Sequence, residues 1–250
     1  MNRITETVKH LIIINVLLYL VTKFVFPNLQ ELFALHFPEN PNFGYWQFVT
    51  SMFMHSQDMF MHIAFNMLAL WMFGSPLEQI WGRNKFLFFY FSAGIGAGLI
   101  YTLVNYYQFN SIYNELINLG AKSSELKNLL STGQYNTDGI LGQVSQDKLL
   151  SIYQTFNTPA VGASGAIYGI LVAFGMKFPE AKLALIFFPV PIAAKYFIPI
   201  LIAMDLLSGL TGYSIFGGGN VAHFAHVGGA LVGFLIMLYW KKNQFKRWDK

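Results

Sequence analysis

Hydrophobic residues are grouped into six long runs that alternate with shorter polar stretches along the chain. A helix of about 20 apolar residues crosses a hydrocarbon layer about 30 Å thick, so each run is a candidate membrane-spanning helix. The first, second and fifth runs are short, which implies local thinning of the bilayer or irregular helix ends. The predicted spans are residues 10–26, 59–73, 86–107, 160–178, 196–210 and 221–240.

The composition favours a membrane protein over a soluble one. Hydrophobic residues make up 54% of the chain and charged residues only 11%, whereas a soluble domain carries about 25% charged residues. We therefore predict an all-α, polytopic fold: a single membrane domain over residues 1–250, built as a bundle of six transmembrane helices in the lipid bilayer. Because the chain has no cysteine, disulfides and thiolate sites are excluded.

The distribution of basic residues predicts the orientation, because Lys and Arg are enriched in cytoplasmic loops. Of the 16 Lys and Arg residues, only Lys23, Lys122, Lys127 and Lys148 lie on the side opposite to the N-terminus in the six-span scheme. Both termini are therefore expected in the cytoplasm, with the protein in the cell inner (plasma) membrane. The first run lacks a small-residue cleavage site, so we interpret it as a span and not as a signal peptide. The net charge of +4 follows from this bias, and no pattern typical of nucleic-acid binding accompanies it.

The segments between the spans have compositions of their own. Residues 27–58 are rich in aromatic residues and proline and are expected to lie on the outer membrane surface, and "GSPLEQIWGRNK" is interpreted as an inner turn after the second span. Residues 108–158 are rich in Asn, Ser, Gln and Gly, so they are predicted to form an extracytoplasmic insertion with one or two amphipathic helices. Residues 183–191 are too short and too rich in proline for a span and are predicted to form an interfacial loop.

Three sets of polar residues lie within the predicted spans, where polar side chains usually face a cavity or one another. Ser164 lies in "GASGAIYG" near the outer end of the fourth span, and His226 lies in "AHFAHVGGALVG" near the outer end of the sixth. His62 and Asn66, in "HIAFN", are four residues apart in the second span and therefore share a helix face. Because the predicted topology places all three sets at a similar depth, they could converge on one pocket.

Glycines beside these residues predict a close contact between the fourth and sixth spans. Gly229 and Gly233 follow His226 at i+3 and i+7 and give that face a smooth strip, on which another helix can pack almost backbone to backbone. The corresponding glycines around Ser164 are Gly162, Gly165 and Gly169. If the two faces meet, the Ser164 hydroxyl comes within hydrogen-bonding reach of the His226 imidazole. A serine beside a neutral imidazole is an activated nucleophile with its general base.

Each feature also has a purely structural interpretation. Taken alone, GxSG in a membrane helix more often serves packing, a histidine can bond to backbone or water, and His62 with Asn66 can join two helices. A metalloprotease or metal transporter that uses His62, His223 and His226 is a competing interpretation. Intramembrane zinc proteases need HExxH and a carboxylate ligand, however, and that motif is absent, so no metal and no cofactor are expected. The conjunction of three polar sets at one depth favours a catalytic site.

At this point the chain resembles the rhomboid family of intramembrane serine proteases. "GASG" matches the family's GxSG, "HIAFN" its HxxxN, and "AHVGGALVG" its AHxxGxxxG. "GSPLEQIWGRNKF" is similar to the family's G-x3-E-x3-G turn, and "YWQFVTSMFMH" to its aromatic first loop. The resemblance covers all six spans and most loops. Two departures are Gln47 after Trp46, where the family often has arginine, and the long insertion at 108–158.

The resemblance implies a catalytic dyad, in which Ser164 attacks the scissile carbonyl and His226 takes its proton. It also implies that Asn66, His62 and the Ser164 amide form the oxyanion hole, and it suggests that Tyr168 stacks on the His226 ring.

Two other polar residues are given no catalytic role. No acidic residue lies near His226 in the sequence, and the nearest candidate, Asp205, carries no motif, so a dyad oriented by ring stacking is expected in place of a triad. His223 is one helical turn nearer the surface than His226 and is expected to meet water or the outer loops.

The implied function is endoproteolysis of transmembrane protein substrates near their extracytoplasmic end. The backbone of an intact helix is shielded by its own hydrogen bonds, so the scissile segment has to unwind. We expect substrates with small or helix-breaking residues there, and lateral entry past the fifth span. The alternative is a non-catalytic relative that binds membrane clients, which would be expected to lack Ser164 or His226.

Overall fold

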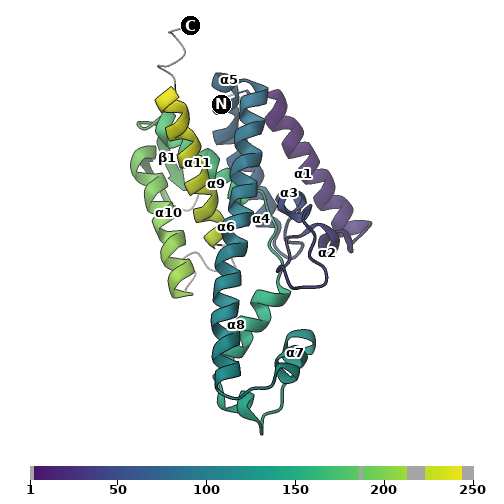
Figure 1. The fold of residues 1–250 in the computed structure, drawn as a ribbon. Coiled ribbons are helices and arrows are strands. Elements are labelled where there is room, and N and C mark those ends of the chain that lie inside the picture. The colour runs from purple at the N-terminus through teal and green to yellow at the C-terminus, as the bar shows by residue number, and fades with distance from the viewer. Residues whose placement is uncertain (1–2, 186–187, 213–222, 244–250) are drawn as a thin grey trace.

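The computed structural model describes residues 3–185, 188–212 and 223–243, and most of these residues are helical (Figure 1). A helix is present at each of the six predicted spans, and five are long and apolar enough to cross a membrane. These five are α1 (Glu6–Phe24), the continuous segment Phe60–Trp81, α6 (Arg83–Asn118), α10 (Ala194–Thr211) and α11 (His223–Asn243). The predicted all-α polytopic fold is therefore confirmed.

The remaining helix, α9 (Ser164–Lys177), corresponds to the fourth predicted span. It has only 14 residues and is the most buried of the six. It packs against α6, α10 and α11, and most of its side chains between Gly165 and Phe174 are buried. The predicted span began four residues earlier, at Ala160. There the backbone instead pairs with the first loop, where Leu35 and Ala160 exchange two hydrogen bonds of 2.9 and 2.8 Å. Non-helical backbone at this level is tolerated because protein surrounds it and satisfies its polar groups.

The second span is longer than predicted. It runs without a break through α4 (Phe60–Ala69), the π-helical turn η2 (Leu70–Gly74) and α5 (Ser75–Trp81), and the chain reverses only at Gly82, whose φ is +74°. The predicted inner turn is therefore mostly helix. Pro76, which has no N–H for the helix ladder, lies at the start of α5 directly after the wider π turn.

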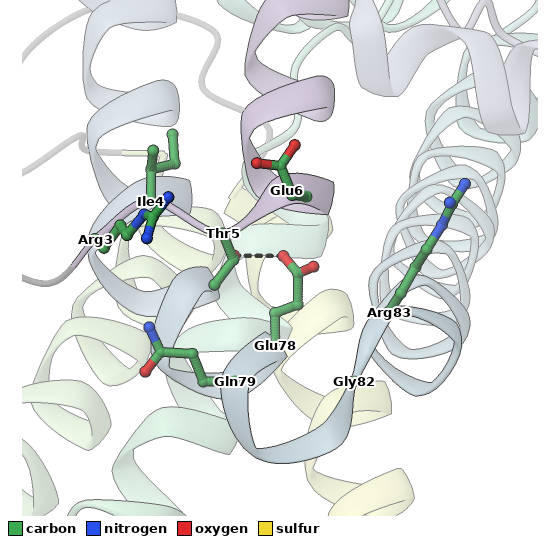
Figure 2. A pocket seen from close by; sticks show the side chains of 8 residues that line it. All are labelled: Arg3, Ile4, Thr5, Glu6, Glu78, Gln79, Gly82 and Arg83. Carbon is green, nitrogen blue, oxygen red and sulfur yellow. Dashed lines mark hydrogen bonds between the residues drawn. The ribbon is translucent and has the colours of Figure 1, made fainter.

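Glu78 joins this segment to the start of α1. Its carboxylate accepts hydrogen bonds from the Thr5 hydroxyl and from the backbone N–H groups of Thr7 and Val8, each of the latter at 3.0 Å. Figure 2 shows the contact with Thr5 at the end of the bundle where the chain begins. The carboxylate thus satisfies N–H groups that the first turn of a helix leaves free, and it fixes α1 against α5.

The insertion forms a small helical unit of its own. The third span does not end at 107: α6 continues to Asn118, and no glycine or proline lies between residue 107 and Gly120. α7 (Ser123–Thr132), η3 (Ile140–Gln143) and α8 (Gln146–Asn157) follow and lie beside the lower part of α6 (Figure 1). They bury a separate apolar core that includes Phe109, Leu116, Leu126 and Ile152. The prediction of amphipathic helices in this segment is confirmed.

Gln47 anchors the first loop, which contains α2 (Leu29–Phe33), α3 (Gln47–Thr50) and η1 (Ser51–Phe53). Its side chain is fully buried, accepts from the His36 N–H at 3.1 Å, and donates to the carbonyl oxygens of Leu32 and Asn42 at 3.2 and 2.7 Å. Glutamine at this position therefore holds the loop through three backbone groups.

The segment 183–191, predicted to be an interfacial loop and not a span, contains two short strands. β1 (Lys182–Leu185) and β2 (Phe188–Ala193) form an antiparallel hairpin, in which Lys182 pairs with Ala193 and Leu183 with Ile192. Both strands are edge strands, so the proline in β2 at position 191 removes no bond from a sheet interior.

Candidate active site

Ser164 is the half-buried first residue of α9, and the turn that precedes it sets its position. Gly162 has a φ of +124°, a conformation that other residues rarely adopt, and a Cβ there would lie 2.8 Å from His62 Nε2. The Gly162 N–H donates to the carbonyl oxygen of Ser51 at 3.0 Å, which attaches this turn to the first loop. Since Ser164 opens the helix, its own N–H has no partner within α9, and the helix dipole favours negative charge beside it.

Glycines bring α9 and α11 into backbone contact, as the sequence predicted. A Cβ added at Gly229 would lie 1.9 Å from the Gly165 carbonyl oxygen, and one added at Gly233 would lie 2.7 Å from Gly169 Cα. No side chain fits between the helices at these two levels. This contact places His226 Nε2 2.9 Å from Ser164 Oγ.

Tyr168, one turn after Ser164, lies against the histidine ring. The ring centroids of Tyr168 and His226 are 4.3 Å apart and the ring planes differ by 9°. The predicted stacking is therefore present in the structure. The Tyr168 hydroxyl extends past the imidazole and donates to Asp205 Oδ2.

Asp205 of α10 is the residue that the sequence reasoning missed. Its carboxylate is buried, and Oδ1 lies 3.1 Å from His226 Nδ1 and 2.5 Å from His223 Nδ1. The expectation that no acid supports His226 is wrong. His223, which was expected to meet water or the outer loops, is partly exposed but also bonds to Asp205. A usable signal was present, because an ionisable residue in an apolar span is expensive and usually functional.

His62 and Asn66 lie on α4 beside the turn that precedes Ser164, but the hydrogen bonds of the two side chains differ. His62 Nδ1 accepts from the Ser56 N–H at 3.4 Å, so the ring proton is on Nε2, which faces Gly162. The Asn66 amide donates to the His62 carbonyl oxygen at 2.8 Å, and within the described ranges no hydrogen bond links it to Ser164. The part of Asn66 in an oxyanion hole stays a prediction.

A second histidine, His55, supports His62 from the loop before α4. Its ring lies 5.2 Å from that of His62 and is fully buried. Burial, and to a lesser degree the neighbouring His62, lowers the pKa of His55 to about 3. His55 is therefore neutral at physiological pH.

The three polar side chains around His226 define its chemistry. An ionised Asp205 can only accept hydrogen bonds, so His226 carries its proton on Nδ1 and presents the Nε2 lone pair to the Ser164 hydroxyl. This is the chain of contacts of a Ser-His-Asp triad, with the tyrosine ring as an additional support. Such an arrangement can activate a serine for attack on a carbonyl carbon.

The chain is similar to known proteins over most of its length. Residues 42–121 and 131–243 match the family model described as the Rhomboid domain. The human presenilin-associated rhomboid-like protein, mitochondrial, is 29% identical over 247 residues, which cover 96% of this chain and 51% of that protein. Rhomboid protein 1, mitochondrial, of Saccharomyces cerevisiae is 28% identical over 78% of this chain and 41% of its own length. Rhomboid protease AarA of Providencia stuartii is 29% identical over 78% of this chain and 55% of its own length. The chain spans about half the length of the curated relatives it matches.

Proposed function

Because the chain belongs to the rhomboid family and is a multi-pass membrane protein, we propose that it is a serine endopeptidase that cleaves transmembrane segments of other membrane proteins. One observation carries the proposal: His226 Nε2 lies 2.9 Å from Ser164 Oγ while Asp205 holds Nδ1 of the same ring. The similarity to Rhomboid protease AarA of Providencia stuartii adds support.

In the proposed reaction, Ser164 Oγ attacks the scissile carbonyl carbon and His226 Nε2 takes its proton. The Asp205 carboxylate stabilises the imidazolium that forms, and the stacked ring of Tyr168 holds the orientation of the imidazole. His226 then gives the proton to the leaving amine, and water hydrolyses the acyl-enzyme by the reverse sequence of steps.

The developing oxyanion would be stabilised beside the N-terminus of α9. The Ser164 N–H is free of helix bonds, and His62 Nε2 lies on the adjacent side of the Gly162 turn. We assign these two donors to the oxyanion hole and add the Asn66 amide, which would have to turn away from the His62 carbonyl. Each well-placed donor contributes about 100- to 1,000-fold in rate.

Substrate entry past α10 is supported by the position of that helix at the edge of the bundle. One of its faces packs on α9 and α11, whereas Ile200, Leu207 and Leu210 on its other side are exposed. Asp205 bonds to residues of both neighbouring helices. Movement of the whole helix would therefore separate Asp205 from His226. We infer that the substrate displaces the segment after Asp205, toward the end of α10 at Thr211, and leaves the triad assembled.

The proposed location is the cell inner (plasma) membrane with both termini cytoplasmic. The first turn of α1 and the last turn of α11 lie at one end of the bundle, and α7 and α8 lie beyond the other (Figure 1). Basic residues gather at the former end, which agrees with the positive-inside rule. The insertion would then lie outside the cytoplasm, near the end at which Ser164 opens α9.

The test compares wild-type protein with Ser164→Ala, using a model transmembrane substrate and a fluorophosphonate probe. The wild type is expected to cleave the substrate and to be labelled at Ser164, whereas Ser164→Ala does neither and keeps its thermal unfolding temperature. Cleavage by the variant at a rate near that of the wild type would show that the serine is not the nucleophile. A folded wild type that neither cleaves nor reacts with the probe would favour the alternative of a non-catalytic binder of membrane clients.

A further inference from the structure

The Nδ1 atoms of two histidines are directed at the same carboxylate oxygen, Asp205 Oδ1. His223 Nδ1 and His226 Nδ1 lie 2.5 and 3.1 Å from Asp205 Oδ1, and the three ligand atoms all lie within 4.8 Å of one another. The proposed hydrolysis needs only the contact with His226. The second histidine on Asp205 therefore has no part in the reaction described above.

We propose that Asp205, His223 and His226 form an inhibitory binding site for a zinc ion. Two imidazole nitrogens and a carboxylate oxygen are a ligand set that zinc accepts, with a fourth position left for water. A hydrogen bond from an outer partner usually orients such a carboxylate. The Tyr168 hydroxyl supplies this bond to Asp205 Oδ2, which leaves Oδ1 directed at the two histidines.

The spacing of the ligand atoms suits this ion after small shifts. Zinc ligands at about 2.0–2.2 Å in a tetrahedral arrangement are about 3.4 Å apart. The His226 contact, at 3.1 Å, is already near that separation, and the His223 contact, at 2.5 Å, has to lengthen. The side chains of His223 and His226 are 15% and 13% exposed, so an ion can reach the site without unfolding of the bundle.

Zinc at this position would stop the proposed reaction by changing the tautomer of His226. In the active form the ring proton is on Nδ1 and the Nε2 lone pair faces Ser164. When zinc binds Nδ1, that proton leaves, and the neutral ring carries its single proton on Nε2. Nε2 then donates to Ser164 Oγ and cannot take the hydroxyl proton. The ion acts as a reversible inhibitor and not as a cofactor, since the base is available only in its absence.

The binding test needs no catalysis. Co²⁺ has the ligand preferences of zinc and a visible spectrum, so it is titrated into detergent-solubilised Ser164→Ala protein and then displaced with Zn²⁺. We expect one equivalent of Co²⁺ to bind to the Ser164→Ala protein. The affinity for Co²⁺ is expected to fall at least about 10-fold when the substitution His223→Gln is added to that protein. Glutamine keeps a donor for Asp205 and removes the metal ligand, and His223→Asn serves as a second, shorter replacement if the first does not fold.

The matched control is His55→Gln, because His55 and His62 are the other neighbouring pair of histidine rings near Ser164. This control is expected to bind Co²⁺ as tightly as its parent. Failure of Ser164→Ala to bind either ion, or an equal loss of affinity in His55→Gln and His223→Gln, would overturn the proposal.

The inhibition arm rests on the proposed protease function. Zn²⁺ is expected to slow substrate cleavage by the wild type, a chelator to restore the rate, and His223→Gln to need at least about 10-fold more Zn²⁺ for half inhibition relative to its own metal-free rate. Metal binding without any proteolysis would leave the zinc site standing and remove the protease proposal. Proteolysis that Zn²⁺ inhibits equally in wild type and His223→Gln would support the protease proposal and overturn the zinc site.

Discussion

Gly229 of α11 and Gly165 of α9 lie so close that a single methyl group on Gly229 would overlap the Gly165 carbonyl, at 1.9 Å from its oxygen. Gly165 directly follows Ser164, and Gly229 lies about one helical turn after His226. The contact therefore determines how near the proposed nucleophile and base come to each other.

Gly229→Ala is expected to force α9 and α11 apart and to reduce cleavage of a model transmembrane substrate by at least about 10-fold, because the hydrogen bond from Ser164 to His226 is stretched. Overpacking of this kind also destabilises a fold by about 1–3 kcal/mol. Initial rates and thermal unfolding in detergent measure the two effects. Gly139→Ala is the matched control, since its Cβ would meet nothing nearer than 3.6 Å, and activity of Gly229→Ala equal to this control would contradict the packing argument.

Asp205→Asn is expected to lower kcat at least about 100-fold with little change in KM. The amide keeps the shape of the carboxylate but favours the wrong tautomer of His226, an effect known from serine protease triads. Tyr168→Phe keeps the ring that stacks on His226 and removes only the hydroxyl bond to Asp205, so we expect a smaller loss. Steady-state kinetics of both variants distinguish a triad from a dyad. A near-normal kcat of Asp205→Asn would mean that Asp205 is not needed and that the site is the serine–histidine dyad predicted from the sequence.

His226→Ala and His223→Ala are expected to differ sharply, although the two residues are one helical turn apart on α11. His226→Ala removes the proposed general base and should lower kcat to background, since proton transfer contributes at least about 100-fold. His223→Ala should keep most of its activity, because His223 bonds to Asp205 and not to Ser164. Parallel initial-rate measurements decide the question, and an active His226→Ala beside an inactive His223→Ala would reverse the assignment.

Thermal stability is expected to fall as the pH drops below about 6.5, in part because of His55. The unfolded chain protonates His55 near its usual pKa of 6.5, whereas the buried folded residue stays neutral down to about 3. Between these values the unfolded state binds the extra proton, so stability rises with pH across the window. For one such residue, the free energy of unfolding changes by up to about 1.4 kcal/mol per pH unit. Between pH 6.5 and 5 this amounts to about 2 kcal/mol. Unfolding temperatures of wild type and His55→Gln at pH 7.5 and 5 test this, and equal losses in the two proteins would exclude His55 as a source.

Removal of the insertion is expected to leave some activity on a minimal substrate. The rings of Phe109 and Phe156 are 6.0 Å apart, so the two ends of the insertion lie close together. Residues 109–156, which include the last part of α6, can therefore be replaced by a short linker. The apolar core of the insertion is separate from the cluster that surrounds α9. Complete loss of cleavage by a deletion variant that still unfolds cooperatively would mean that the insertion shapes the site or the substrate entrance.

Much of the fold could be predicted from local patterns. The apolar runs located all six helices, because crossing a bilayer sets a minimum length that few other structures require. Their ends were less predictable: α6 continued to Asn118 and the second span to Trp81, since polar helical residues extend a helix beyond the apolar run. The β1–β2 hairpin was missed because cross-strand pairing joins residues whose local sequence, rich in proline, indicates a loop.

By itself, the sequence determined the candidate residues on α9 and α11. Gly229 and Gly233 share a helix face with His226, and this periodicity is a local property that can be read before any packing is known. Asp205 depended on the tertiary structure. It lies 21 positions before His226 on a helix that is apolar on all sides, so the sequence does not show which face of α10 turns inward. That rotation is set by packing against α9 and α11, and it places one carboxylate beside two histidines and a tyrosine. The tertiary structure therefore decided that the serine–histidine pair has an acidic partner.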